Sequence, residues 1–593
     1  MTIYSTLISR GYFPKELPPS FFTEVFAHYA TTKGGRAALE SYVPTDKFTE
    51  CVAYRLALPG ALRRDLGIPH PSSFSELARL TAKYFRRLLK KAGRSPFSKS
   101  RPVFSSGVHR AFGTSFKPSN LARERFLARA GGSYLVKADV SHFYPSLYTH
   151  AVGWAIDPQL RQKAHWQNKN LLGKKLDQAL MNLQGKVSQG LPIGNDISYL
   201  LAEVVLADVD RALRVPASRA YRWFDDYEVS CDSLHDAELV LSHLRASLGR
   251  FRLRLNAKKT SISPLPRPAQ EEWQKELVQA SRTPLNRHDN VVAFFDTAFR
   301  LRERHPETAV LTYALGLLFR IRVPEPQVVK VAHSGVSQAL LAEPGVAQKA
   351  FSLLSFWHLN GLPLDQKLLT RTVANLVERH RAIGVTSDVS WALAFSLQHQ
   401  LKLSREAGRI LSGCDDDCVA LQALHCNSVG LIPQGFTPKR MERLLKTVNL
   451  DGEHWLLGYE ALRQGFLAAS SAVVQAHPLF SHFLKLGVTF YRTKLPSYSS
   501  VIHPGGAPEW MVSLWFDILG GRDVPVPQAE SARELAVFQV IAGDVQQLAA
   551  ADRSREETIA ALLKAPDPGI AELLADAEEY AGVAAHFGQA DER

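Results

Sequence analysis

The order of apolar and polar residues predicts a mixed α+β region in the first half of the chain. Tyr134 to Val140 is typical of a strand, and Arg219 to Cys231 is typical of a hairpin. Between them, Ile197 to Leu213 repeats apolar residues at helical spacing, which predicts a long amphipathic helix. Phe251 to Ile262 is expected to add a further strand with an internal turn. Together these elements predict one domain over residues 131–265.

A basic stretch precedes this domain. Between Arg79 and Arg129 the chain has fourteen Lys and Arg residues and one acid, Glu124. Within the stretch, Leu77 to Lys91 has the spacing of one helix, with leucines and basic side chains on opposite faces. Such a run is most often a solvated face. Because this excess is local and of one sign, we expect it to contact phosphate groups. Residues 1–130 are therefore assigned to an N-terminal segment and a basic region.

The second half of the chain shows helical periodicity throughout. Residues 266–292 are polar and contain Pro266, Pro268 and Pro284, so we expect a linker there. From 293 to 593 the pattern predicts an all-helical domain with short Gly and Pro turns, and helix pairs of about 40 residues suit a HEAT-like array. After Lys564 the chain becomes acidic and rich in Ala, and we expect its end to fray.

Composition narrows the class of partner. The chain has 593 residues, a net charge of +14 and a pI of about 9.4, which favours an anionic partner such as phosphate or an anionic membrane. Its five cysteines are scattered and odd in number, as expected for a reducing cytosol rather than a disulfide scaffold. We see neither a signal peptide nor an apolar run of about 18 residues, so we expect a cytoplasmic protein with no membrane partner.

Three carboxylates carry the candidate chemistry. Asp139 ends the expected strand, and Asp225 and Asp226 interrupt the aromatic hairpin that follows. An Asp pair usually marks a turn or a solvated loop. Here it lies in strand composition, a domain-sized interval after another strand-terminating Asp. Antiparallel pairing of the two strands would gather oxygen ligands of the kind that Mg²⁺ prefers. Two such ions, roughly 3.5–4 Å apart, form the clamp used for in-line phosphoryl transfer.

The motifs around these acids resemble a known family. Asp139 with Phe143-Tyr144, Gln189-Gly190-Leu191-Pro192, and Trp223-Phe224-Asp225-Asp226 resemble motifs A, B and C of reverse transcriptases. The longer forms, Phe143 to His150 and Gln189 to Asn195, resemble the bacterial abortive-infection (Abi-type) branch and its defence-associated relatives. The resemblance covers about residues 1–265 well. It implies a fold class of α+β reverse-transcriptase palm and fingers, followed by an all-α C-terminal domain.

The resemblance also implies roles for single residues. Asp139, Asp225 and Asp226 would be the catalytic ligands of two Mg²⁺ ions, for which Mn²⁺ is an alternative. Tyr144 would crowd a ribose 2′-hydroxyl and so select deoxynucleoside triphosphates, while Gln189 and Gly190 would approach the incoming nucleotide. Lys259, in Asn256-Ala257-Lys258-Lys259-Thr260, would lie near the leaving pyrophosphate. One departure is Trp223, which stands where these enzymes usually carry Tyr.

Members of the Abi-type branch make DNA without a template, from a tyrosine hydroxyl of the protein itself. The resemblance therefore implies an antiphage polymerase with a single-stranded DNA product, acting as a homo-oligomer. Several N-terminal tyrosines are candidates for the priming hydroxyl, and we favour Tyr42, in Glu40-Ser41-Tyr42-Val43-Pro44. The alternative is a templated reverse transcriptase that copies a cognate noncoding RNA. A third alternative is a nucleic-acid sensor without enzymatic activity, which the three clustered acids disfavour.

Two further groups carry weaker signals. Cys414, Cys418, His425 and Cys426 match no common zinc spacing, so we expect buried thiols there rather than a metal site. Arg300 and His305 have the Arg-x4-His spacing of certain RNases, but one such match is expected by chance in a basic chain of this length.

Overall fold

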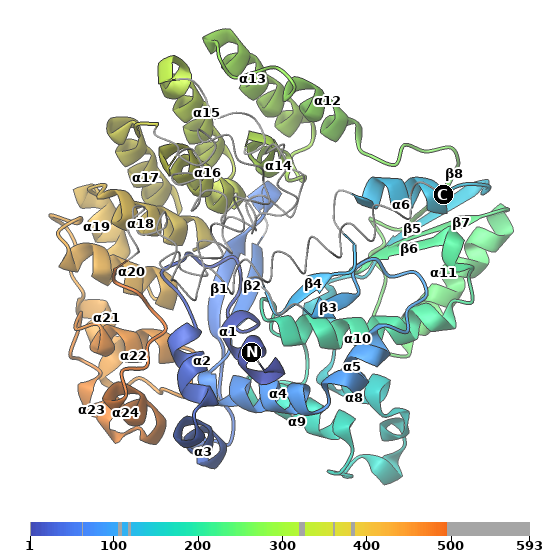
Figure 1. Cartoon of the computed structure of the whole chain (residues 1–593), viewed down its shortest axis with the longest axis horizontal. Helices are drawn as coiled ribbons and strands as arrows, with labels where there is room; N and C mark the ends of the chain where they lie inside the picture. Colours follow the sequence, from blue (N-terminus) through green and yellow to red (C-terminus); the bar gives the residue numbers. More distant parts are fainter. Residues whose placement is uncertain are drawn as a thin grey trace, which may run out of the picture. The chain divides into compact units, whose positions relative to one another are not determined.

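The computed structural model describes residues 2–494, except 62, 105–109, 117–119, 319–325, 360–361 and 381–385. The protein is a mixed α+β structure with a helical C-terminal part (Figure 1). Residues 1–493 form one compact unit. The expected acidic, Ala-rich end after Lys564 lies outside the described residues, as does the rest of the expected helical domain beyond 494. No helix in the described ranges combines the length and the apolar character needed to cross a bilayer.

Short helices and two hairpins make up the N-terminal region. Its elements are α1 (Ile3–Arg10), α2 (Glu24–Thr31), α3 (Lys33–Ser41), β1 (Val52–Ala57), β2 (Arg63–Ile68), α4 (Pro71–Lys83), α5 (Phe85–Ala92), β3 (Pro102–Phe104), β4 (Phe112–Thr114) and α6 (Leu121–Ala128). The single helix expected from Leu77 to Lys91 is two helices, because the Tyr84 backbone (φ −109°, ψ 20°) leaves helical geometry. Leu77 in α4 and Leu88 in α5 are both fully buried.

A four-stranded antiparallel sheet forms the centre of the next region. Its strands are β5 (Tyr134–Asp139), β6 (Ala220–Trp223), β7 (Asp226–Cys231) and β8 (Ser261–Pro264), in the order β6-β7-β5-β8. The helices are α7 (Phe143–Ser146), α8 (Thr149–Ile156), α9 (Leu172–Asn182), α10 (Asp196–Ala212) and α11 (Leu234–Gly249). Helix α11 packs on β5 and β7, and α10 packs on α5 and α8. The sequence prediction of the first strand, the hairpin and the long helix is confirmed.

The strand expected over Phe251 to Ile262 is much shorter than predicted. Pairing with β5 begins only at Ser261, opposite Lys137. The residues before it turn instead, because the Asn256 side chain accepts a hydrogen bond from the Lys258 amide (3.1 Å) and the Asn256 amide donates to the Asp139 carbonyl (2.8 Å). This turn brings the following lysine, Lys259, next to the end of β5.

The helical part is a stacked array of short helices. Its helices are α12 (Glu272–Ala280), α13 (His288–Arg304), α14 (Val310–Leu318), α15 (Val329–Ala342), α16 (Ala347–Leu359), α17 (Gln366–His380), α18 (Ser387–His399), α19 (Arg405–Ser412), α20 (Asp417–Ser428), α21 (Lys439–Lys446), α22 (Trp455–Arg463), α23 (Ser471–Ala476) and α24 (Pro478–Lys485). From α12 to α22, each helix packs against the next but one along the chain. Such stacking of helix pairs is the arrangement of α-solenoids.

This array begins earlier than the sequence suggested. Residues 266–292, expected as a linker, contain α12, which is a regular helix between Pro268 and Pro284. Trp273 and Leu277, one turn apart on α12, are buried, and the Trp273 ring lies edge-on to Tyr313 with 5.4 Å between ring centroids. Apolar burial at this spacing therefore outweighs the polar composition of the segment.

The N-terminal segment packs on the helical part. The Phe22 amide donates to the Phe490 carbonyl (3.0 Å), and the Trp391 indole donates to the Glu16 carbonyl (2.8 Å). A continuous apolar core runs from α1 and α4 through the sheet region to α20, α22 and α24. The sheet region and the later helices α20, α22 and α24 therefore share one core.

Candidate active site

The three predicted carboxylates meet at one edge of the sheet. Antiparallel pairing of β5 with β7 sets Asp139 directly opposite Asp226. Asp225 occupies the turn between β6 and β7, and its carbonyl accepts a hydrogen bond from the Val140 amide (3.2 Å). The register of two short strands is therefore what gathers residues that lie about ninety positions apart in the sequence.

The charges of this site are not balanced within the chain. Burial, followed by the negative charges of Asp225 and Asp139, raises the pKa of Asp226 well above its usual range. Burial also raises the pKa of Asp225. The cation in direct contact is Lys259, whose ammonium lies 3.0 Å from Asp139 Oδ2 and whose pKa is raised by that hydrogen bond. Three acids facing one lysine make a donor set that favours added positive charge.

The three carboxylates are ligands of the type that a divalent cation prefers, but they are not arranged as a complete metal site. Within the described ranges, no three His, Cys, Asp or Glu side chains are gathered closely enough to be a formed metal cluster. The Lys259 ammonium holds the face of Asp139 that a metal would share. Carboxylate oxygens are nevertheless the ligands that Mg²⁺ uses beside substrate phosphates, and Mg²⁺ usually needs only one or two of them from the protein.

The Asp225 turn has an unusual backbone that a buried network supports. Phe224, immediately before it, has φ +52°, in the left-handed region that a bulky residue rarely adopts. Its amide donates to Ser100 Oγ (2.8 Å), and its carbonyl accepts from an Arg222 guanidinium nitrogen (2.7 Å). Hydrogen bonds to the peptide groups on both sides of Phe224 therefore hold the turn that carries Asp225.

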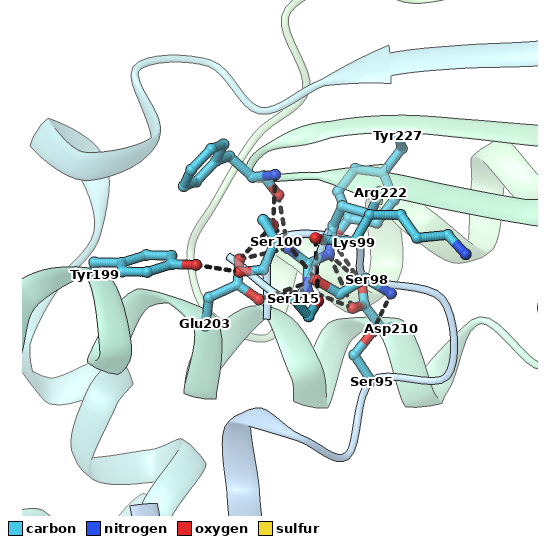
Figure 2. Close-up of polar contacts among 11 residues, drawn as sticks. Ser95, Ser98, Lys99, Ser100, Ser115, Tyr199, Glu203, Asp210, Arg222 and Tyr227 are labelled. Atoms are coloured by element: carbon cyan, nitrogen blue, oxygen red, sulfur yellow. Dashed lines mark hydrogen bonds and ion pairs between the residues drawn. The ribbon is translucent and has the colours of Figure 1, made fainter. Parts of the chain in front are cut away.

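Arg222 is the centre of this network, and its side chain is completely buried (Figure 2). Two guanidinium nitrogens contact Glu203 at 2.9 and 3.0 Å, and Asp210 accepts from the other side at 2.7 to 3.0 Å. Tyr227 also donates to Asp210 (3.0 Å), while Ser98 and Ser100 donate to Glu203. Every polar group of this buried ion pair is thus bonded, which is the condition for tolerating charge in a core.

Three acids on α10 hold separate segments of the chain. Asp196, Glu203 and Asp210 are spaced by seven residues, so they share one face of the helix. Asp196 accepts from the Arg110 guanidinium (2.6 Å) and the Phe112 amide (3.1 Å), at the start of β4. Glu203 and Asp210 bind the loop at Ser98–Ser100 and strand β6, as described above. We call these three residues the acidic row of α10.

The residues predicted to face a nucleotide also come together. Gly190 has φ +90°, its amide donates to the Leu147 carbonyl (3.1 Å), and the next amide donates to the Tyr144 carbonyl (3.0 Å). A Cβ at Gly190 would make ordinary contact with the Pro145 carbonyl oxygen (3.4 Å), so the positive φ, and not crowding, is what favours glycine here. Gln189 is exposed and pairs with Tyr148. Tyr144 is half-buried, and burial raises the pKa of its hydroxyl.

Arg64 is a site residue that the sequence analysis missed. It is exposed on β2, far from the basic stretch in sequence. Burial raises the pKa of both Asp225 and Tyr144, and the positive charge of Arg64 opposes that rise at each of them. The β1–β2 hairpin thus places a cation near both residues. The available signal was the pair Arg63-Arg64 at a hairpin turn.

The basic stretch is only partly free for phosphate. Arg87 pairs with Asp157, Lys99 with Glu124 (2.7 Å), and Arg129 with Glu228 (2.6 Å). Folding therefore supplies carboxylates that are distant in sequence, and these cations have structural partners. Arg86 and Lys90 of α5 are exposed, so the predicted phosphate contact stays a prediction for these residues.

Tyr42 lies with residues of the helical part and not with the carboxylates. Its hydroxyl donates to Asp451 Oδ1 (2.7 Å) and lies 2.9 Å from His477 Nε2. Burial, and then the hydrogen bond with Asp451, raises the pKa of this hydroxyl. These contacts therefore tie the Tyr42 side chain to the helical part.

The remaining sequence candidates have structural surroundings. Cys418 and Cys426 are fully buried in α20, where burial raises the pKa of each thiol, and His425 Nδ1 lies 3.0 Å from the Tyr491 hydroxyl. Arg300 pairs with Glu276 of α12, while His305 follows α13 as an exposed residue.

No protein-family model and no curated protein matches this chain. Among solved structures, apo telomerase from Candida tropicalis is similar over 63% of this chain and 70% of its own length, with a TM-score of 0.29 and 9% sequence identity. That similarity is distant, so the proposal below depends on the residues of the site.

Proposed function

We propose that this chain is a nucleotidyltransferase of the reverse-transcriptase type, which polymerises deoxynucleotides. The observation that carries the proposal is the meeting of Asp139, Asp225 and Asp226 at one sheet edge, with unbalanced negative charge. Positioning and electrostatics supply most of the catalysis in phosphoryl transfer, so such a site requires no covalent nucleophile.

Asp139 and Asp225 are the residues that would hold Mg²⁺ or Mn²⁺, with Asp226 beside them. When bound, the metal supplies positive charge to the triphosphate as its negative charge redistributes. Binding requires the Lys259 ammonium to leave Asp139 Oδ2, where it lies at 3.0 Å. The exposed side chain of Lys259 leaves it free to turn toward a triphosphate.

Residues of the chain itself would bind the triphosphate and transfer a proton in the reaction. A hydroxyl oxygen attacks the α-phosphorus of a deoxynucleoside triphosphate, forming one P–O bond as the bond to pyrophosphate breaks. The hydroxyl proton passes to water, and the Lys259 ammonium, once it has left Asp139, can give a proton to the leaving pyrophosphate. Arg64 offers a cation for the triphosphate. The Gly190 turn sets Gln189 beside Tyr144, which crowds the ribose.

The finer assignment is an Abi-type polymerase in antiphage defence, with protein-primed and template-independent synthesis. The extended motifs around Tyr144 and Gln189 support it, as does the helical array that follows. Bacterial cytoplasmic location, a single-stranded DNA product and a homo-oligomer belong to the same proposal. Tyr42 would act as primer only after its hydroxyl leaves Asp451. A templated enzyme that copies a noncoding RNA is the second candidate.

The test of the site is the Asp225→Asn variant. We expect incorporation of labelled deoxynucleotides to fall by about 1,000-fold, because a preorganised charge is lost where the transition state needs it. Its melting temperature should not fall, since burial already disfavours the charged form of Asp225. Asp232→Asn is the matched control, because Asp232 is exposed just after β7 and pairs with Arg219. Wild-type incorporation by Asp225→Asn would reject the proposed function.

The mode of synthesis is tested on protein purified from cells. DNA that stays covalently bound through denaturation, and that is lost in Tyr42→Phe, would support protein priming from Tyr42. One discrete RNA that co-purifies with the protein, with product complementary to it, would support the templated alternative. Sequencing the bound nucleic acid separates the two.

A further inference from the structure

Arginines and aromatic rings gather on the surface next to the candidate active site. They come from three places in the chain: α8 with the residue just before it, the short helix η3 (Pro158–Arg161) that follows α8, and the loop after α11. We call this group the arginine strip. Its members are Tyr148, Trp154, Arg161, Arg250, Arg252 and Arg254.

The rings hold two guanidinium groups in place. The Arg161 guanidinium carbon lies 5.2 Å from the centre of the Trp154 ring and 4.8 Å from that of Phe251. The Arg252 guanidinium carbon lies 5.5 Å from Tyr148 and 5.8 Å from Trp154. Stacking of this kind fixes a guanidinium while leaving its N–H groups directed sideways for other partners.

These arginines have no carboxylate partner. Among the residues that the structure describes, none of Arg161, Arg250, Arg252 and Arg254 forms an ion pair, in contrast to Arg87, which pairs with Asp157 just before η3. Within the described ranges, the single hydrogen bond made by these four side chains runs from Arg161 to the Arg250 carbonyl (2.8 Å). All four residues are exposed. Burial and the neighbouring Arg250 charge lower the pKa of Arg161, as expected where positive charge is concentrated.

Backbone contacts join the arginine strip to the segment just after Asp139 and to Gln189, which is predicted to approach the nucleotide. The Arg254 carbonyl accepts from the Ser141 amide (2.8 Å), two residues after Asp139. Tyr148 pairs with Gln189. Arg252 also has φ +61°, a left-handed conformation that a long side chain rarely adopts, so the loop holds this residue in an unfavourable backbone to present it here.

From this geometry we infer that the arginine strip binds the sugar–phosphate backbone of a single-stranded nucleic acid that extends from the active site. Fixed, unpaired guanidiniums are the groups that recognise phosphate with two parallel hydrogen bonds. Their rings serve to position the arginines, so the strip reads no base sequence. This surface would bind the strand that the proposed polymerase makes or copies. The inference rests on the proposed function only in saying which strand is bound.

The test is binding of fluorescent 12-nucleotide oligo-dT and oligo-U to the full-length Asp225→Asn protein, without nucleotides, at several salt concentrations. For a single strand, each phosphate contact contributes about 0.7 to the steepness of log affinity against log salt. The double variant Arg161→Ser/Arg252→Ser removes two such contacts, so it should reduce that steepness by about 1.4. At 0.1 M salt, the same relation gives a loss of about 25-fold. Similar losses for DNA and RNA are expected from a backbone site.

The matched control is Arg443→Ser/Lys446→Ser, which removes two exposed cations from α21 in the helical part. It should keep the wild-type slope. A second variant, Arg161→Lys/Arg252→Lys, retains charge but loses the stacked plane, and we expect an intermediate affinity. An unchanged slope in the Ser variant, or an equal loss in the control, would overturn the inference. Binding is measured in a variant that does not polymerise nucleotides. The binding result can therefore be interpreted even if the proposed polymerase function is rejected.

Discussion

Replacing Arg222 by Met tests the network that holds the Asp225 turn. The substitution keeps an unbranched side chain but removes every guanidinium contact with Glu203 and Asp210, whose side chains are 2% and 0% exposed. Both acids would then be buried without a counter-charge. Breaking a buried ion pair in this way costs about 3–5 kcal/mol, because the remaining charge keeps its desolvation penalty.

The size of this unit sets the thermal shift to expect. Residues 1–493 form one compact unit. At about 2.1 cal/mol/K per residue, its unfolding entropy is about 1 kcal/mol/K, so a loss of 3–5 kcal/mol lowers the melting temperature by about 3–5 °C. Differential scanning fluorimetry measures this shift, and incorporation of deoxynucleotides should fall with it because the Phe224 carbonyl loses its donor.

Arg219→Met is the matched control for this prediction. Arg219 precedes the same hairpin and pairs with Asp232 at 2.5 Å, but the two side chains are 32% and 66% exposed. Exposed pairs contribute about 0–1 kcal/mol, so the melting temperature should change by about 1 °C or less. The reasoning is refuted if both variants melt alike. Adding Glu203→Gln and Asp210→Asn to Arg222→Met should recover part of the loss, since neutral amides remove the unpaired charges.

Two further predictions concern nucleotide choice and pH. Tyr144→Ala should raise incorporation of ribonucleotides relative to deoxynucleotides by about 10-fold or more, because the ring that crowds the 2′-hydroxyl is gone; an unchanged ratio in competition assays would contradict that role. Burial of Glu460 in α22 raises its pKa to about 7. The folded state therefore binds the proton more tightly than the unfolded state, and stability from this group is lost as pH rises from about 4.5 to 7, by about 3 kcal/mol. Glu460→Gln should remove that loss, so its melting temperature relative to wild type should rise between pH 5 and 8; a constant difference would argue against it.

The sequence anticipated the parts of this protein that depend on local pattern. A strand that ends at Asp139 and an aromatic hairpin around Asp225 and Asp226 follow from alternation and composition, and so does the long helix between them. Their meeting required only antiparallel pairing. The length of β8 was not predictable in this way, because the turn at Asn256 uses a hydrogen bond to the end of β5.

Long-range partners were beyond the reach of sequence pattern. Counting charges between Arg79 and Arg129 could not show that Glu228 and Asp157 would pair with Arg129 and Arg87. Arg64 was missed for the related reason that a hairpin of another region brings it to the site. The buried acids of α10 did leave one signal, since Glu203 interrupts the apolar run from Leu200 to Ala207 in a helix that is buried on nearly every side.

The acidic row of α10 has a consequence for how the molecule can move. Fourteen residues separate Asp196 from Asp210, a span of about 21 Å along the helix axis. Over that length, one helix is bound to the segment before β3, to β4 and to the hairpin that carries Asp225. Sliding any of these segments past the others would leave a buried charge without its partner. The three segments therefore resist independent movement, because a buried acid of the same helix holds each of them.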